Sequence, residues 1–146
     1  MTAYARTENA ARLGALLARR LSDRNVVRDV IALQRAARAL HLLSVRACNE
    51  DFTCSACGGD GDGPMECVSG DHPHQPCPKC DGTGLTIGKR RIRLADAARS
   101  IAYAYGFRLY VQCDPLGWPL YLIPETYPPS EDSATYDLHG VAVCPL

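Results

Sequence analysis

Residues 54–61, CSACGGDG, and residues 77–84, CPKCDGTG, are two copies of one eight-residue unit with the pattern C-x-x-C-x-G-x-G. A C-x-x-C pair bends the backbone so that two thiolates point at one position, and two such pairs supply the four sulfurs of a tetrahedral zinc site. The glycines let the chain turn back beneath the metal through positive φ angles. The sequence therefore predicts one zinc ion on Cys54, Cys57, Cys77 and Cys80; two disulfides or four unrelated thiols are the alternatives.

The repeated unit resembles the cysteine-rich zinc region of DnaJ-type co-chaperones, in which such units pair to hold zinc. The resemblance covers roughly residues 54–84, and this chain carries two units where the co-chaperone region carries four. It therefore implies a DnaJ-like finger with one zinc ion. The His-Pro-Asp tripeptide of a J-domain is absent from the sequence, so the resemblance does not imply a co-chaperone function.

The composition indicates a globular protein. The 146 residues are 47% hydrophobic, which suffices for one compact domain or two small lobes around a metal. No apolar run of about 18 residues and no secretory signal are found in the sequence. The chain has eight cysteines, four of them in motif-like pairs, and no such signal, which favours a reducing compartment, so we expect a cytoplasmic protein.

The net charge of zero conceals opposite charges in neighbouring segments. Residues 1–50 contain nine Arg against four acids, a balance of +5, and residues 51–84 contain one Lys against six acids, a balance of −5. A zinc finger that binds nucleic acid is usually basic, so an acidic finger favours protein recognition. The candidate partner-binding residues are Asp60, Asp62, Glu66 and Asp71 in the finger and Arg28, Arg35 and Arg38 before it, a solvated helix face being the alternative for the arginines.

Two amphipathic helices are predicted before the finger. Residues 4–21 carry leucines at helical spacing, and a second helix over residues 24–47 carries apolar side chains at alternating spacings of four and three. Ser22 and Asp23 are the expected N-cap of the second helix. The short junction predicts an antiparallel helical hairpin.

A helix and a β-hairpin are predicted after the finger. Residues 85–87 are expected to be extended, a basic run occupies residues 89–93, and a third helix covers residues 94–105 and ends at Gly106. The hairpin comprises strands over residues 107–113 and 118–123, joined by a turn at 114–117, and residues 138–144 add a short third strand. Pro119 predicts that the second strand lies at a sheet edge.

These patterns together predict an α+β fold in three parts. The parts are a helical hairpin over residues 1–50, a zinc finger with four cysteine ligands over residues 51–86, and a helix and β-hairpin with an irregular C-terminal tail over residues 87–146.

Further metal-binding and nucleophilic side chains lie in and near the finger. Cys48, Cys67, His72 and His74 are candidates for a second metal site, with free side chains as the alternative. Cys48 with His41, or with the two finger histidines, is the candidate catalytic arrangement. A histidine beside an apolar stripe is more often a packing residue, and a zinc ion with four cysteine ligands has no open position for water. The sequence therefore predicts that the protein is not an enzyme.

Residues 104–123, AYGFRLYVQCDPLGWPLYLI, are similar to the C-terminal portion of small uncharacterised proteins from tailed phages and proteobacterial mobile elements, which typically read Q-x-D-P-R-G-x-x-L-Y. Residues 40–50, LHLLSVRACNE, are similar to the preceding segment of that group. Leu116 stands where the group tends to have Arg, so a role for that arginine is not carried over.

The second resemblance implies a phage or mobile-element accessory protein in the host cytoplasm. Such proteins often bind a host or defence protein complex, and anti-CRISPR proteins are one class of them. Two alternatives remain: a zinc protein that binds nucleic acid through its Arg-rich helix and the run at residues 89–93, and a Cys-dependent enzyme. No membrane partner is expected, and the sequence leaves the oligomeric state open.

Overall fold

The computed structural model describes residues 2–49, 52–63, 75–112, 118–125 and 140–146. The predicted α+β fold is confirmed, because helices come first along the chain and an antiparallel sheet comes last. The elements are α1 (Ala3–Arg20), α2 (Val26–Asn49), α3 (Gly88–Ala104), β1 (Phe107–Val111), β2 (Leu120–Pro124) and β3 (Val141–Val143).

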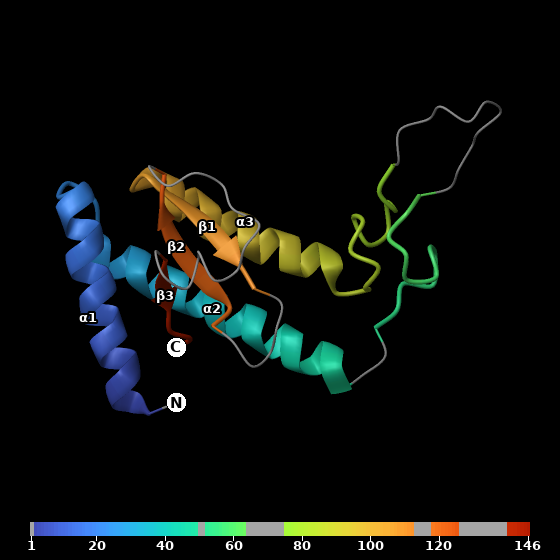
Figure 1. The fold of residues 1–146 in the computed structure, drawn as a ribbon, viewed down its shortest axis with the longest axis horizontal. Helices are drawn as coiled ribbons and strands as arrows, with labels where there is room; N and C mark the ends of the chain where they lie inside the picture. The colour runs from blue at the N-terminus through green and yellow to red at the C-terminus, as the bar shows by residue number, and fades with distance from the viewer. Residues whose placement is uncertain (1, 50–51, 64–74, 113–117, 126–139) are drawn as a thin grey trace.

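Helices α2 and α3 lie side by side and pack against the sheet, which β1 joins directly after α3 (Figure 1). Helix α1 follows the predicted order and short connection, but it crosses the start of α2 instead of lying along it, and it reaches β3 (Figure 1). The finger projects from the end of the molecule where α2 ends and α3 begins (Figure 1). The cysteine units are thereby held away from the sheet.

The sheet has the order β1-β2-β3, and both neighbouring pairs are antiparallel. The expected hairpin is present, with Leu109 opposite Leu122, and the third strand adds to β2. The prediction that the returning strand lies at an edge is wrong, because β2 is central. Pro119 precedes the strand, and its carbonyl accepts a hydrogen bond from the Gln112 N–H at 2.9 Å. Because Pro119 lies outside the strand, its missing N–H removes no hydrogen bond from the sheet.

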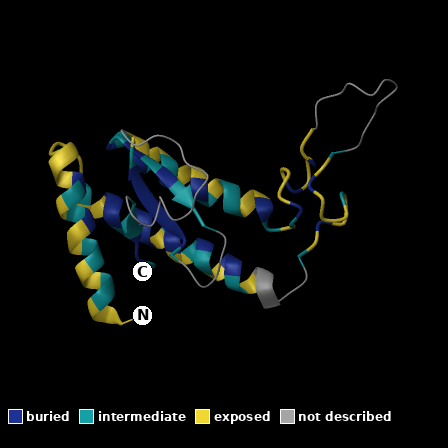
Figure 2. Ribbon diagram, in the orientation of Figure 1, coloured by how far each residue is buried: buried dark blue, intermediate teal, exposed yellow. Residues whose placement is uncertain are grey.

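One hydrophobic core joins the three helices to one face of the sheet (Figure 2). Phe107 and Leu109 alternate into this core, as the predicted strand period requires. Segments before and after the finger therefore stabilise each other. The buried residues are Leu13, Leu17, Val30, Leu33, Ala37, Leu40, Ala98, Ala102, Tyr105, Phe107, Leu109, Leu120, Leu122 and Val143.

The starts of two helices differ from the prediction. Helix α2 begins at Val26, because Asn25 and not Ser22 or Asp23 is its cap: the Asn25 Oδ1 accepts a hydrogen bond from the Arg28 N–H at 3.1 Å. Helix α3 begins at Gly88, six residues before the predicted start. The basic run at residues 89–93 is therefore helical. Its charged side chains interrupt the apolar period from which a helix is predicted, but Lys and Arg are compatible with helical backbone geometry. Gly106 ends α3 with a φ of 77°, as predicted.

An asparagine on α1 completes the outer edge of β3. The Asn9 Nδ2 donates to the Ala142 carbonyl at 2.9 Å, and the Asn9 Oδ1 accepts from the Cys144 N–H at 2.8 Å. An edge strand leaves such backbone groups without a ladder partner, and one primary amide supplies both a donor and an acceptor. Cys144 itself is buried. The predicted turn at residues 114–117, Cys113 and most of the C-terminal tail lie outside the described residues.

Candidate metal centre

The four cysteines of the two repeated units meet at one place, where their Sγ atoms all lie within 4.8 Å of one another. Cys54, Cys77 and Cys80 are buried and Cys57 is half-buried. The Cys57 and Cys80 Sγ atoms are 3.8 Å apart. The five described cysteines are all free thiols, so the disulfide alternative is not what the structure has.

The first contact that shapes each unit joins its last glycine to its second cysteine. The Gly61 N–H donates to the Cys57 Sγ at 3.4 Å, and the Gly84 N–H donates to the Cys80 Sγ at 3.3 Å. These bonds close the loop behind each C-x-x-C pair and direct positive N–H dipoles at the sulfurs. They favour the thiolate, which is the form that binds metal.

The two units are tied to each other by the same contacts in both directions. The Cys54 N–H donates to the Gly84 carbonyl at 2.9 Å, and the Cys77 N–H donates to the Gly61 carbonyl at 2.8 Å. Short antiparallel bridges extend both pairings, Thr53 with Leu85 and Asp62 with Pro76. The sequence repeat is thus a structural repeat, and neither unit is complete without the other.

The repeat glycines are required by close backbone approach as well as by conformation. A Cβ on Gly61 would lie 2.4 Å from the Gly82 carbonyl oxygen, and one on Gly84 would lie 2.3 Å from that of Gly59. All four of these glycines have φ between 73° and 97°, as the pattern predicts. The position directly after the second cysteine of each unit tolerates a side chain. The first unit has Gly58 there, and the second unit has Asp81 with a φ of 53°.

The donor set fits a zinc ion. Four sulfurs at about 2.3 Å from a tetrahedral zinc lie about 3.8 Å apart, which is the observed separation of the Cys57 and Cys80 Sγ atoms. Burial raises the pKa of the Cys80 thiol, but the Gly84 N–H and the three other thiols outweigh it and lower the pKa to about 7. A thiol with this pKa loses its proton to a metal readily at neutral pH. The four cysteines can therefore hold a metal ion, and zinc is consistent with them.

Helix α3 begins directly against the second unit. The Thr83 Oγ1 donates to the Cys80 carbonyl at 2.7 Å, and the Gly88 N–H donates to the Leu85 carbonyl at 3.0 Å. Gly88 is buried, and a Cβ there would overlap the Thr83 side chain and the Cys80 carbonyl. The second cysteine unit thus fixes where α3 starts, a role for Gly88 that its place in the sequence did not reveal.

The other predicted site residues are dispersed. Asp60 and Asp62 are exposed on the finger, and Arg28, Arg35 and Arg38 are exposed on α2. Glu66 and Asp71, and with them Cys67, His72 and His74 of the candidate second metal site, lie outside the described residues. Cys48 belongs to α2, but its side chain is outside the described part. His41 is half-buried on α2.

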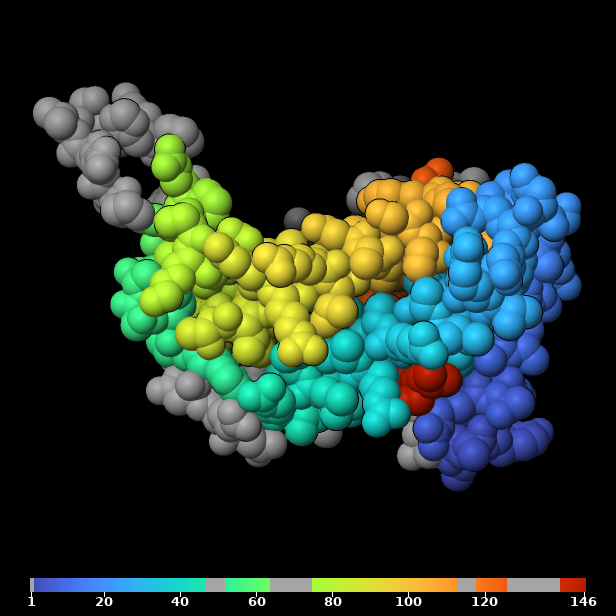
Figure 3. Space-filling model, turned by 180° about the vertical axis from the view of Figure 1, so that it is seen from behind, coloured from blue at the N-terminus to red at the C-terminus, as the bar shows by residue number. Residues whose placement is uncertain are grey.

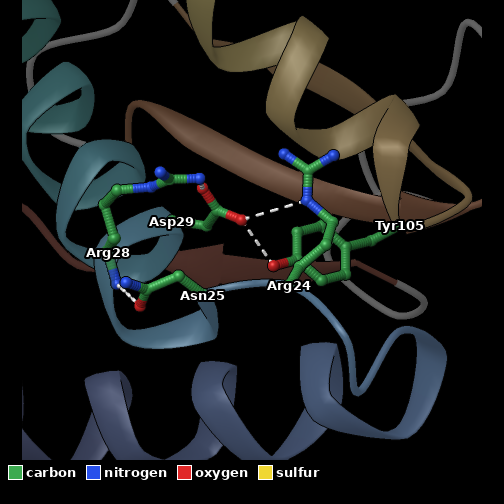
Figure 4. Close-up of polar contacts among 5 residues, drawn as sticks. All are labelled: Arg24, Asn25, Arg28, Asp29 and Tyr105. Atoms are coloured by element: carbon green, nitrogen blue, oxygen red, sulfur yellow. Dashed lines mark hydrogen bonds and ion pairs between the residues drawn. The ribbon is translucent and has the colours of Figure 1, made fainter.

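A buried carboxylate joins the start of α2 to the end of α3 (Figure 4). Tyr105 donates to the Asp29 Oδ2 at 2.5 Å, and the Arg24 Nε lies 3.4 Å from the same oxygen. The Arg28 Nη2 lies 3.6 Å from the Asp29 Oδ1, but the Arg28 side chain is 68% exposed against 5% for Asp29. Burial raises the pKa of Tyr105, and the hydrogen bond to Asp29 and its charge raise it further. The sequence gave no sign of this contact, because Asp29 and Tyr105 lie 76 residues apart.

This chain matches no known protein-family model, no curated protein and no solved structure. Among the described residues, no helix combines the length and the apolar character that crossing a membrane requires.

Proposed function

We propose that this protein is a non-enzymatic zinc protein, and that its metal is structural. The observation that carries the proposal is the convergence of four cysteine thiols at one place. The two C-x-x-C-x-G-x-G units that supply them also complete each other's backbone hydrogen bonds. Four cysteine ligands close the coordination sphere of zinc, so the ion offers no position for a water or a substrate. Its free energy of binding then serves folding.

The action that we propose is binding to a host or defence protein complex in the host cytoplasm, with anti-CRISPR-like inhibition as its concrete form. The support is the phage-like sequence of residues 104–123 together with the projecting finger (Figure 1). Asp60, Asp62 and Asp81 are exposed on that finger. Acidic side chains held on a rigid metal-bound scaffold suit a basic groove on a partner.

The metal half of the proposal is tested by elemental analysis of the purified protein. We expect about one zinc per chain, and loss of the zinc in Cys57→Ser and Cys80→Ser variants. A metal-free protein with an ordered finger contradicts the proposal. A ratio of about two zinc ions per chain would point to the second set of candidate donors, Cys48, Cys67, His72 and His74.

The binding half is tested by affinity capture from host lysate with three forms of the protein. We expect an Asp60→Asn/Asp62→Asn variant to retain less of the captured complex than the wild type. A Glu8→Gln/Asp23→Asn variant removes the same charge from exposed positions outside the finger and should capture as the wild type does. Equal capture by all three contradicts recognition through the acidic finger.

A further inference from the structure

The two long helices that lie side by side carry most of the positive charge of the molecule. Helix α2 contains four Arg and one Asp, and α3 contains one Lys, four Arg and one Asp, so their balances are +3 and +4. The pair thus carries +7 in a chain whose net charge is zero. A field of this size attracts polyanions.

The cations of the two helices are exposed together. Arg28, Arg35 and Arg46 are spaced by seven and eleven residues, which places them on one line of α2, opposite the buried Val30, Leu33 and Leu40. On α3 the exposed cations lie opposite the buried Ala95 and Ala98. Seen from behind, the two helices form one continuous surface that ends at the finger (Figure 3). We use the name basic helix face for six exposed cations of α2 and α3: Arg35, Arg38, Arg46, Lys89, Arg90 and Arg93.

Among the described residues, the acidic side chains of α2 and α3 pair with arginines outside the basic helix face. The buried Asp29 binds Arg24 and Tyr105, and Asp96 pairs with Arg99 at 3.1 Å. Arg38 donates a hydrogen bond to the backbone oxygen of Leu146 at 3.2 Å. Within the described part of the chain, Arg35, Lys89, Arg90 and Arg93 form no ion pair.

The first turns of α3 carry positive charge at the end of the helix where negative charge is favoured. The N-terminal end of a helix is its positive end and favours acidic side chains, yet the first turn of α3 has none. The first turn has Lys89, Arg90 and Arg91 instead, and Arg93 follows in the second turn. Such a conflict between local preference and sequence is typical of a functional surface.

We propose that the basic helix face binds the phosphate backbone of nucleic acid. An acidic protein is the competing partner. Protein interfaces have an apolar centre. Among the described residues of α2 between Arg35 and Arg46, however, Leu42 is the only large apolar side chain that is exposed. Nucleic-acid interfaces are far more positively charged and need no such centre. The surface is separate from the acidic finger, so the inference goes beyond the proposed function.

The test is a titration of a fluorescently labelled 20-base-pair DNA duplex, and of the RNA duplex of the same sequence, with zinc-loaded protein at several salt concentrations. We expect at least one of the two to bind at low salt, with the logarithm of the association constant falling linearly as the logarithm of salt rises. An Arg90→Gln/Arg93→Gln variant should lower the steepness of that line by about 0.9 for each phosphate that it no longer binds. Its affinity at 0.1 M salt should fall by roughly tenfold for each such phosphate.

The matched control is an Arg12→Gln/Arg19→Gln variant, which removes the same net charge from exposed positions on α1. It should bind as the wild type does, and both variants should keep the zinc content and melting temperature of the wild type. The proposal is overturned if neither duplex binds at low salt, or if the two variants lose the same affinity. Binding of poly-glutamate without binding of either duplex would assign the face to an acidic protein. An Asp60→Asn/Asp62→Asn variant should bind the duplex at least as well as the wild type, which separates this test from that of the finger.

Discussion

Single residues decide the metal centre, and the glycines matter as much as the cysteines. The sequence pattern was sufficient to predict which four cysteines come together and the positive φ angles behind them. It did not reveal that Gly61 packs on Gly82 and Gly84 on Gly59, because a pattern within one unit says nothing about the distance to the other. The contact between units is a property of the folded pair.

Replacing Gly84 by Ala should prevent the two units from closing. The added Cβ would meet the Gly59 carbonyl oxygen at 2.3 Å, and the residue would have to keep a φ of 73°. We expect loss of zinc or a large drop in zinc affinity, measured by competition with a chromogenic chelator. Gly58→Asp is the control, because nothing lies within 4 Å of its Cβ position and Asp81 occupies the equivalent place. Retention of zinc by Gly84→Ala would show that the units can close without this contact.

Replacing Tyr105 by Phe should leave the buried Asp29 carboxylate without its shortest hydrogen bond. An unsatisfied buried group costs about 1–3 kcal/mol, so the free energy of unfolding should fall by this amount in denaturant titrations. Tyr103→Phe is the control, since Tyr103 is exposed two residues earlier. Equal stability of the two variants would show that the hydroxyl contributes nothing.

The same tyrosine predicts a dependence on alkaline pH. The pKa of Tyr105 is raised in the folded protein, so its stabilising contribution is complete below the ordinary tyrosine pKa of 10.0 and is lost as the pH rises from there through the folded value. The free energy of unfolding should therefore decline above about pH 10. The decline should be smaller in Tyr105→Phe, and an identical decline in both proteins would contradict this role.

At the scale of helices and strands, the sequence predicted which elements exist better than where they begin. The apolar period located the helices, alternation located β1, and the turn after it located β2 as the returning strand. The start of α3 was missed because its first turns are held by the finger and carry no apolar stripe. The central place of β2 was missed because it depends on β3, a three-residue strand whose outer edge is bound by Asn9 on α1.

The contact between α1 and β3 can be tested at Asn9. An Asn9→Ala variant leaves the Ala142 carbonyl and the Cys144 N–H without their partner, and we expect the free energy of unfolding to fall by about 1–3 kcal/mol. The adjacent Glu8 is exposed, and Glu8→Ala should change stability by less than about 0.5 kcal/mol. Hydrogen exchange at the Cys144 amide should rise in the first variant alone. Unchanged exchange there would mean that the edge is protected in another way.

The whole molecule contains two separate sources of stability. The apolar core unites α1, α2, α3 and the sheet, whereas the only buried cluster among the described finger residues consists of cysteines. Each large apolar side chain in the core contributes about 1.5–3 kcal/mol, and none of these side chains belongs to the finger. The described part of the finger has no comparable apolar core, so we expect its order to depend on a metal ion held by the cysteines.

Removal of the metal should therefore unfold the finger and leave most of the helical signal. After treatment with a strong chelator at neutral pH, we expect far-ultraviolet circular dichroism to retain the contribution of α1, α2 and the later turns of α3, because their buried side chains keep their partners. Hydrogen exchange should rise sharply at the Cys54, Cys77 and Gly84 amides, which bond across or within the two units. It should also rise at Arg91, whose N–H donates to Ile87 at the start of α3, since that start rests on the second unit. Loss of the whole helical signal would mean that the core depends on the finger, and unchanged exchange at the finger amides would mean that the two units hold together without metal.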